Sequence, residues 1–292
     1  MEIIKPDVFH IGIPKAGSTS IQDLLNNDER VTVTRSRFYT SKLWWKNHKI
    51  INEPEKVVIE SNETLISGGF QKVKFSQVVE RFYKINSKAK IIIVIRNQPE
   101  AIMSMYKYHI KNAFYGTENF QNWLLETDLG IDYLSLCFYN NILDLILAYF
   151  PKEQIEVLIF EELKSNPINF YNKLYEVLGL SLESNDFPKS NINGFNDKQL
   201  YSLTLLNYFS FNKKKSENPY YSNLGYKIEQ RIKKGIVRRL SLKPKKGFFS
   251  WSGIDSKERI YNDFMYSNKK LVDFKFVEES DLIKYNYLLP EK

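Results

Sequence analysis

Apolar and polar residues follow two patterns along the first 180 residues, which are short apolar runs and longer stretches with helical spacing. The runs "VFHIGI" from Val8 and "KIIIVI" from Lys90 are apolar at almost every position. Such runs indicate strands that are buried on both faces. The strands predicted in this way are Val8–Ile13, Val31–Thr34, Lys56–Ser61, Lys90–Ile95 and Gln154–Phe160.

Stretches with helical spacing lie between these strands. The predicted helices are Ser18–Leu25, Gln71–Ile85, a series from Pro99 to about Phe150, and "NPINFYNKLYEVLGL", which ends at Gly179. Strand and helix alternate at least four times, which predicts an α/β fold with a parallel sheet flanked by helices. We expect the P-loop NTPase-like form of this fold.

The pattern changes near residue 183, where the chain becomes polar, Lys-rich and helical. We expect a single domain over 1–292, with an α/β core at 1–182 and a helical, basic C-terminal portion at 183–292. A separate C-terminal domain is the alternative. The 292 residues are enough for one large domain or two small ones.

Composition indicates a globular protein from a reducing compartment. Hydrophobic residues make up 43% of the chain, and Cys137 is the single cysteine, so no intrachain disulfide can form. The N-terminal stretch "MEIIKPDVFHIGI" has no basic region or cleavage site of a signal peptide. No apolar run is long enough to span a bilayer. We therefore expect a cytoplasmic protein without a transmembrane segment.

Positive charge is concentrated in one segment. Residues 213–246 hold twelve Lys and Arg but two acids, Glu217 and Glu229, so they carry +10 in a chain whose net charge is +8. This segment is open to three interpretations: a solvated surface, a groove for an anionic or partly sulfated glycan, or a patch that binds nucleic acid. Few aromatic residues interleave with the cations, so we expect no specific nucleic-acid partner.

The stretch "GIPKAGST", from Gly12 to Thr19, has the layout of a phosphate-binding loop between a buried strand and a helix. Glycines let the backbone approach an anion, and the backbone N–H groups and dipole of the helix favour negative charge there. The spacing differs from the P-loop pattern G-x-x-x-x-G-K-[ST], because Ser18 stands where the lysine belongs and Lys15 lies inside the loop. A capped helix after a tight turn is the alternative.

A second candidate site follows the strand Lys90–Ile95. Arg96 lies at its carboxyl end, where ligands of open α/β sheets bind, and Ser104 lies eight residues further, two turns into the next helix. A guanidinium and a hydroxyl suit a second phosphate. A magnesium-dependent NTPase needs an Asp at the end of such a strand, and this strand ends in Arg.

Glu60 ends another predicted strand at the same edge. A carboxylate there can accept a proton from an attacking hydroxyl, and Glu63 is a nearby competitor.

These residues together resemble the sulfotransferases that use 3′-phosphoadenosine 5′-phosphosulfate (PAPS). The stretches "FHIGIPKAGSTSIQDLL" and "IIIVIRNQPEAIMSMYKYH" are similar to that family's two phosphate-binding motifs, and "FEELKSNPINFYNKLYEVLGL" is similar to a later stretch. The resemblance covers roughly residues 7–180, with a weaker similarity in "YSNKKLVDF". The stretch "IESNET" is similar to the carbohydrate, heparan-type branch, which points to a bacterial member of it.

The resemblance implies a role for each of these residues. PAPS would be the sulfuryl donor, 3′,5′-adenosine diphosphate (PAP) the product, and no metal would be needed. Lys15 would contact the oxygen that bridges phosphate and sulfate. The residues around it would hold the 5′-phosphate, and they are Pro14, Ala16, Gly17, Ser18 and Thr19. Arg96 and Ser104 would hold the 3′-phosphate.

The resemblance leaves the general base open. Glu60 is the first candidate, and the small-molecule branch instead uses a histidine, for which His48 and His109 are available. The sequence departs from the family at Gln98, where many members have Pro, and in the absence of a glycine-rich C-terminal loop. We expect a saccharide or glycolipid acceptor. The alternatives are a P-loop nucleotide kinase or NTPase, and a protein that binds polyanions through residues 213–246.

Overall fold

The computed structural model describes residues 2–42, 44, 49–67, 72–112, 119–183, 187, 195–208, 224–239, 242–245 and 247–291. The chain divides into two compact units. The first, here called the sheet unit, comprises Met1–Gln98, Leu136–Ser190 and Tyr261–Lys292, and the second, here called the helical unit, comprises Pro99–Ser135 and Asn191–Ile260. Each unit therefore draws on both sides of residue 182. The single-domain organisation expected from the sequence stays a prediction.

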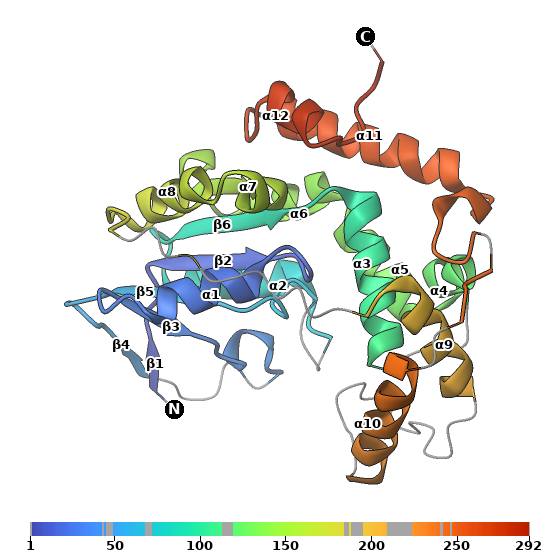
Figure 1. Ribbon diagram of the computed structural model, residues 1–292. Coiled ribbons are helices and arrows are strands. Elements are labelled where there is room, and N and C mark those ends of the chain that lie inside the picture. Colours follow the sequence, from blue (N-terminus) through green and yellow to red (C-terminus); the bar gives the residue numbers. More distant parts are fainter. Residues whose placement is uncertain are drawn as a thin grey trace. The chain divides into compact units, whose positions relative to one another are not determined.

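Five parallel strands form the central sheet of the sheet unit (Figure 1). They are β2 (Val8–Gly12), β3 (Val31–Thr34), β5 (Val57–Ser61), β6 (Lys90–Ile95) and β7 (Ile155–Ile159), in the order β3-β5-β2-β6-β7. All five strands were predicted, and no end differs from the predicted one by more than one residue. The predicted α/β fold with a parallel sheet is confirmed, and it brings β2 and β6 side by side.

A second, two-stranded sheet was not predicted. In it β1 (Glu2–Ile4) pairs in parallel with β4 (Lys49–Ile51). Strands of three residues are too short to show a period, so the sequence pattern cannot reveal them.

Helices cover both faces of the central sheet. Those of the sheet unit are α1 (Ser18–Asn26), α2 (Phe75–Ile85), α6 (Tyr139–Leu147), α7 (Phe160–Ser165), α8 (Pro167–Leu178), α12 (Glu279–Lys284) and most of α11 (Lys257–Asp273), with 3₁₀ turns η1 (Phe38–Thr40) and η3 (Lys152–Gln154). Right-handed crossovers place α1 on one face and α2 and α6 on the other, because the chain moves across the sheet in opposite directions.

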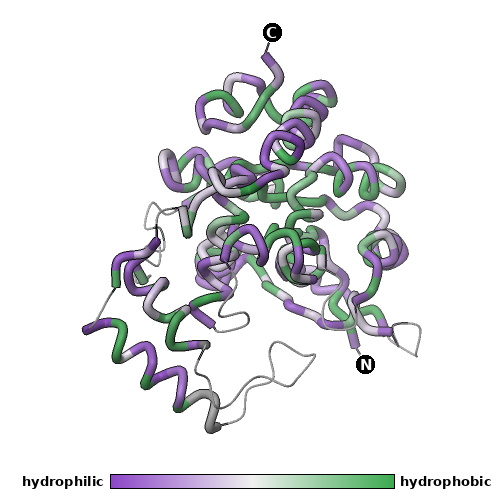
Figure 2. Tube along the Cα trace, turned by 90° about the vertical axis from the view of Figure 1, so that its right-hand side faces the viewer, coloured by the Kyte–Doolittle hydropathy of each residue, from purple (hydrophilic) through white to green (hydrophobic). Residues whose placement is uncertain are grey.

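Aromatic side chains fill the face beneath α2. Phe9 of β2 stacks on Phe82 of α2 with ring centroids 4.1 Å apart, and Tyr39 of η1 meets Phe9 edge-on at 5.5 Å. Figure 2 shows the pattern behind this packing, since the helical segments alternate between hydrophilic and hydrophobic residues along their length. On another element, α8 ends as predicted, at Gly179, whose φ of 72° is left-handed.

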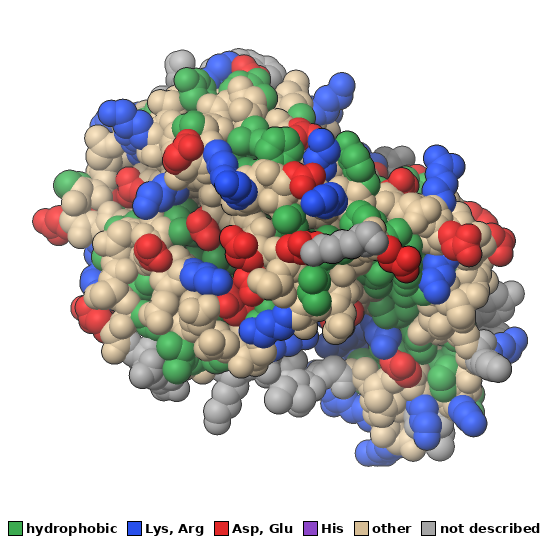
Figure 3. Space-filling model, turned by 90° about the horizontal axis from the view of Figure 1, so that it is seen from above, with side chains coloured by type: hydrophobic (Ala, Val, Ile, Leu, Met, Phe, Trp, Pro, Cys, Tyr) green, Lys and Arg blue, Asp and Glu red, His purple; other side chains and the backbone are tan. Residues whose placement is uncertain are grey.

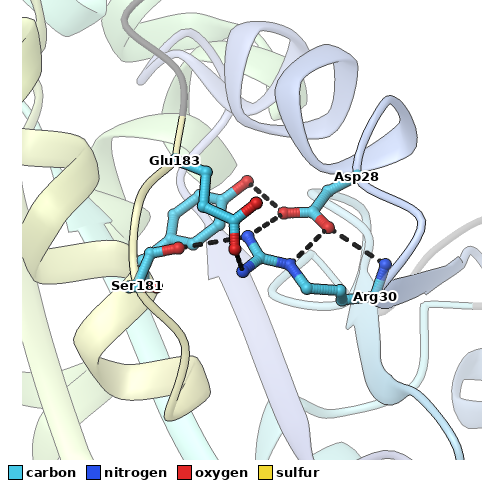
Figure 4. A network of polar contacts seen from close by, with 5 residues as sticks. Asp28, Arg30, Ser181 and Glu183 are labelled. Carbon is cyan, nitrogen blue, oxygen red and sulfur yellow. Dashed lines mark hydrogen bonds and ion pairs between the residues drawn. The ribbon is translucent and has the colours of Figure 1, made fainter.

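A polar network joins the turn before β3 to the segment that follows α8 (Figure 4). Arg30 donates to Asp28 at 2.9 and 2.7 Å and to the Ser181 carbonyl at 3.1 Å, and it pairs with Glu183. The Tyr175 hydroxyl donates to the same Asp28 carboxylate at 2.9 Å. The hydrogen bonds from Arg30 lower the pKa of Asp28 to about 2. The network therefore holds the start of the edge strand β3 against the chain after α8.

The helical unit contains α4 (Phe120–Glu126), α9 (Asp197–Tyr208), α10 (Leu224–Arg239), the 3₁₀ turn η4 (Trp251–Gly253), nearly all of α3 (Gln98–Lys111) and most of α5 (Asp128–Leu136). Its core is aromatic. The ring centroid of Tyr106 lies 5.3 Å from the ring centroids of both Phe120 and Trp123. The predicted helices between Pro99 and Phe150 are confirmed. No helix in the described part of the chain is both long and apolar enough to cross a membrane.

Candidate functional site

The loop Gly12–Thr19 connects β2 to α1 and has an unusual backbone. Lys15 has a φ of 75°, which is rare for a residue with a side chain, and Gly17 has a φ of 86° at the N-cap of α1. No side chain caps α1. The first backbone N–H groups of this helix are therefore left for another acceptor. The alternative considered from the sequence, a helix capped by a side chain, does not form.

Both glycines of the loop occupy places where a side chain would collide. A Cβ atom on Gly12 would lie 2.1 Å from the Ser18 hydroxyl oxygen, and one on Gly17 would lie 2.9 Å from the Phe160 ring and Leu163. Ser18 is buried, whereas Thr19 is exposed and Lys15 is half-buried. The loop is thus a narrow backbone cradle in which one buried hydroxyl and one lysine accompany the start of a helix.

Arg96 is attached to this loop. Its guanidinium donates to the Lys15 carbonyl at 2.8 Å and lies 4.8 Å from the centroid of the Phe160 ring. The contact exists because β6, which ends at Ile95, is the hydrogen-bonded neighbour of β2. The expectation that Arg96 lies near the first loop is therefore confirmed.

The turn after Arg96 is held by residues from distant parts of the sheet unit. The Asn97 N–H donates to Glu161 at 3.0 Å, and the Asn97 side chain donates to the Asn286 carbonyl at 2.7 Å. Glu161 also accepts from the Tyr287 hydroxyl at 3.0 Å. Burial raises the pKa of Glu161, against the effect of the hydrogen bonds it accepts. Gln98 exchanges side-chain hydrogen bonds with Asn268 of α11 at 2.5 and 3.2 Å.

Glu60 is the next-to-last residue of β5, which pairs with β2 on the side away from β6. Its carboxylate is 1% exposed and accepts from the Thr34 hydroxyl at 2.7 Å and from the Ser36 N–H at 2.8 Å. Burial raises the pKa of Glu60 to about 7, although both hydrogen bonds oppose this shift. A carboxylate with this pKa changes its charge near neutral pH, which suits a general base. Glu63, the competitor from the sequence, lies exposed in the following turn.

A buried neutral cluster lies one residue away, on the opposite face of the sheet. His10 is the register partner of Ser61, as Phe9 is of Glu60. Because successive residues of a strand point to opposite faces, His10 and Ser61 share the α1 face, while Glu60 lies on the face covered by α2. The His10 Nδ1 atom lies 2.7 Å from the Ser61 hydroxyl, and Gln22 of α1 donates to Ser61.

The other predicted residues belong to the helical unit or fall outside the described residues. Ser104 is half-buried on α3 within the helical unit, so its part in a phosphate site with Arg96 stays a prediction. His109 is buried in that unit and accepts from the Trp123 indole at 3.0 Å. His48 lies outside the described residues. Cys137 is fully buried.

The chain matches the family described as "Sulfotransferase domain" over residues 5–266. It belongs to this family. The family is defined by sulfuryl transfer, and the match covers both the anion cradle and the Arg96 turn. Sulfuryl transfer is thereby favoured over the nucleotide kinase considered from the sequence.

The sulfotransferase fold recurs among solved structures. A sulfotransferase from Alicyclobacillus acidocaldarius is 18% identical with a TM-score of 0.52, over 71% of this chain and 92% of that one. Mouse sulfotransferase SULT7A1 complexed with PAP is 14% identical with a TM-score of 0.43, over 96% and 90% of the two chains. The sulfotransferase domain from the curacin biosynthetic pathway is 12% identical with a TM-score of 0.47, over 99% and 100%. No curated protein sequence matches the chain.

Sequence reasoning missed several residues that shape the site. His10, Gln22 and Ser61 form the neutral cluster, while Glu161 and Asn268 hold the Arg96 turn. One signal was visible, since His10 is the polar residue in the otherwise apolar strand "VFHIG". Asn268 falls in "YSNKKLVDF", which carried the weaker part of the family resemblance.

Proposed function

We propose that this sulfotransferase uses PAPS as the donor and transfers the sulfuryl group to a hydroxyl of a saccharide or glycolipid. The observation that carries the proposal is the contact between the two anion-binding elements. Arg96, at the end of β6, donates to the carbonyl of Lys15 inside the uncapped loop. The two stretches that we assign to phosphate binding, 81 residues apart at this contact, thus meet at one sheet edge.

The loop fits the 5′-phosphosulfate end of PAPS. It presents helix N–H groups that no side chain caps, a backbone free of Cβ atoms at Gly12 and Gly17, and the buried hydroxyl of Ser18. We assign the 5′-phosphate to Gly17, Ser18 and Thr19, with Pro14 and Ala16 shaping the loop. Arg96 and Ser104 are assigned to the 3′-phosphate, as the sequence predicts.

Two side chains carry the chemical step in this proposal. The acceptor oxygen forms a bond to sulfur while the bond from sulfur to the bridging oxygen breaks, in line, so that PAP leaves. Glu60 takes the proton of the acceptor hydroxyl. The Lys15 ammonium offsets the negative charge that develops on the departing phosphate oxygen. The lysine therefore belongs inside the loop, where its target is an oxygen next to sulfate.

The raised pKa of Glu60 supports its choice as the base. A carboxylate with its ordinary pKa is a weak base at neutral pH, whereas one that titrates near 7 accepts a proton more readily. Thr34 and Ser36 hold the group in one orientation, on the α2 face of the sheet. His48 and His109 are the alternatives if Glu60 is not the base.

Calorimetry with PAP, compared with ATP and magnesium, tests the donor assignment. We expect PAP to bind and ATP to bind much more weakly. Tighter binding of ATP would overturn the proposal and restore the nucleotide kinase. Transfer of sulfate from PAPS to a panel of saccharides, measured by mass shift, then tests the acceptor class.

The helical unit offers a site for an acidic group of the acceptor. Lys111 of α3 and Arg238 of α10 both lie over the Phe195 ring, at 6.0 and 5.8 Å from its centroid. Lys234 is close to both cations, and its pKa is lowered by burial and then by their charge. The one acid of α10, Glu229, pairs instead with Lys233 at 2.6 Å. Three cations without an acid among the described residues favour an anionic ligand.

Charge is arranged differently on the face that Figure 3 shows, where Lys and Arg side chains are interspersed with Asp and Glu. Ion pairs such as Lys173–Glu162 and Lys269–Asp273 balance the charges of the sheet unit. The cluster around Phe195 therefore differs from the mixed charges of the face in Figure 3. We infer that the acceptor carries carboxylate or sulfate groups.

Paired acceptors test this inference. Replacing Lys234 and Arg238 together by Ala should raise the KM for carboxymethyl-dextran about tenfold and leave the KM for dextran unchanged. Lys269→Ala is the matched control, because it removes an exposed cation elsewhere. An equal effect on both acceptors, or none on either, would contradict an anionic acceptor. Higher salt should weaken the carboxymethyl-dextran preference in the parent enzyme.

A further inference from the structure

The buried His10 lies in β2, two residues before the loop begins at Gly12, and its side chain lies close to Gly12. It is fully buried, and burial lowers its pKa to about 4, so the imidazole is neutral at physiological pH. A neutral imidazole has one N–H donor and one acceptor nitrogen, and the hydrogen bond at one nitrogen decides the role of the other.

The Gln22–Ser61 pair assigns those two roles. The Gln22 amide donates to the Ser61 carbonyl at 3.0 Å and to the Ser61 hydroxyl oxygen at 3.1 Å. With its oxygen accepting from Gln22, the Ser61 hydroxyl has its hydrogen left to donate, and His10 Nδ1 lies 2.7 Å away. The opposite tautomer would leave the Ser61 hydrogen without an acceptor among the described residues. His10 therefore carries its hydrogen on Nε2.

That Nε2 atom and the Ser18 hydroxyl both lie close to Gly12. A Cβ atom on Gly12 would lie 3.3 Å from His10 Nε2 and 2.1 Å from Ser18 Oγ. Both atoms therefore lie near the same position at Gly12, the first residue of the loop. Both are buried, and neither has a hydrogen-bond partner within the part of the chain that the structure describes. A buried donor and a buried hydroxyl without partners are costly, unless each gains a partner when the loop binds its ligand.

We propose that His10 is a positioning residue for the donor phosphate, acting through Ser18. In the loaded loop the His10 Nε2–H donates to Ser18 Oγ, and the Ser18 hydroxyl hydrogen is thereby directed at the 5′-phosphate. The hydrogen bonds then run in one direction, from Gln22 through Ser61, His10 and Ser18 to the anion. This inference rests on the proposed binding of PAPS by the loop.

Two variants of similar shape test the two ring nitrogens of His10 one at a time. His10→Gln places an amide N–H near the position of Nε2 and keeps a donor for Ser18. His10→Asn reaches only the position of Nδ1, so it keeps the contact with Ser61 and loses the donor. Calorimetry should show PAP affinity about tenfold weaker in His10→Asn, as expected for one hydrogen bond, and within about twofold of the parent in His10→Gln. Equal affinities in the two variants would overturn the proposal.

A double-mutant cycle with Ser18 tests whether His10 acts through it. In a Ser18→Ala background, His10→Asn should change PAP affinity by less than about twofold, because the acceptor of the His10 hydrogen bond is gone. Additive losses would mean that His10 supports the fold alone, and they would overturn the proposal. Circular dichroism melts of each variant check that the folded state is retained.

Nuclear magnetic resonance measures the tautomer of His10 in the parent protein itself. The chain has 3 histidines, so the ¹⁵N signals of His10 can be assigned by single substitutions. We expect the Nε2–H tautomer and no titration of His10 between pH 6 and 8. An Nδ1–H tautomer would overturn the inference even if PAP binds. Failure of the parent to bind PAP would instead overturn the proposed function and leave the tautomer result standing.

Discussion

The two sides of the anion loop differ in how firmly their residues are held. On the β6–β7 side, the turn after Arg96 is fixed by Glu161, Asn286 and Asn268, which come from three distant segments. On the β3–β5 side, Glu60 is held by Thr34 and Ser36, which follow one another closely on β3 and the chain beyond it. The Arg96 turn is therefore tied to more distant parts of the chain than Glu60 is.

The two sides also differ in the charges that surround their buried carboxylates. The positive charge of Arg96 opposes the rise of the pKa of Glu161, whereas no cation among the described residues contributes to the pKa of Glu60. A buried carboxylate without a cation keeps a readily exchanged proton near neutral pH. We infer that the β6–β7 side binds and the β3–β5 side reacts, and this division can be tested residue by residue.

The largest effect should come from Glu60→Gln. The amide can still accept from Ser36 and donate to the Thr34 hydroxyl, so the packing is preserved while the base is lost. Turnover should fall by about 10²- to 10⁴-fold, with PAP affinity unchanged. Steady-state kinetics and calorimetry measure the two quantities. Normal turnover would move the base elsewhere, with His48 as the next candidate.

The second effect is the pH dependence of stability at Glu60. Its pKa is raised on folding, from 4.5 to about 7, so the unfolded state releases the proton first as the pH rises. The parent should lose about 3 kcal/mol relative to Glu60→Gln as the pH rises from 4.5 to 7, with no further loss above 7. Urea denaturation of both proteins at pH 5 and pH 8 gives the difference. A constant difference would show that Glu60 titrates normally.

Arg96→Lys should have the next largest effect, on binding. A lysine can neither keep the planar contact with Phe160 nor reach Lys15 and a phosphate together. PAP affinity should fall by about 30-fold, which corresponds to roughly 2 kcal/mol. Arg259→Lys, at an exposed position of α11, is the control. Loss of turnover at saturating PAPS, without loss of PAP affinity, would show that Arg96 acts in the chemical step and would contradict its assignment to binding.

The smallest effect should come from Tyr287→Phe, which removes one hydrogen bond to Glu161. The Asn97 N–H still holds that carboxylate, so the Arg96 turn is loosened and not lost. We expect a loss of about 1 kcal/mol in stability and about threefold in PAP affinity. Thermal melts and calorimetry measure both. A change in kcat with unchanged affinity would contradict a role on the binding side.

The sequence predicted the elements that depend on local pattern. Buried apolar runs such as Val8–Gly12 and Lys90–Ile95 stood out. Gly12, Lys15 and Arg96 were found because they lie at the end of such a strand or shortly after it. The sequence could not show contacts between residues that are far apart along the chain. Gln98 and Asn268 are separated by 170 residues, and no periodicity links them.

The state of Glu60 also lies beyond sequence reasoning. Its position at the end of β5 was predicted, but its pKa depends on burial against residues of β3 and η1. Likewise, His10 is visible as a polar residue in an apolar strand, whereas its tautomer depends on Ser61, 51 residues further along the chain. A site is therefore located by local sequence, and its chemistry is set by the surroundings that folding supplies.

The contact between Asn97 and Asn286 has a consequence for biosynthesis. The two residues are 189 positions apart, so a ribosome that adds 5–20 residues per second needs about 10–40 s to deliver the second after the first. During that interval the nascent chain can form β2, its loop and β6, yet the turn after Arg96 has no C-terminal partner. The site proposed to bind the donor should therefore be complete only after translation has passed α12.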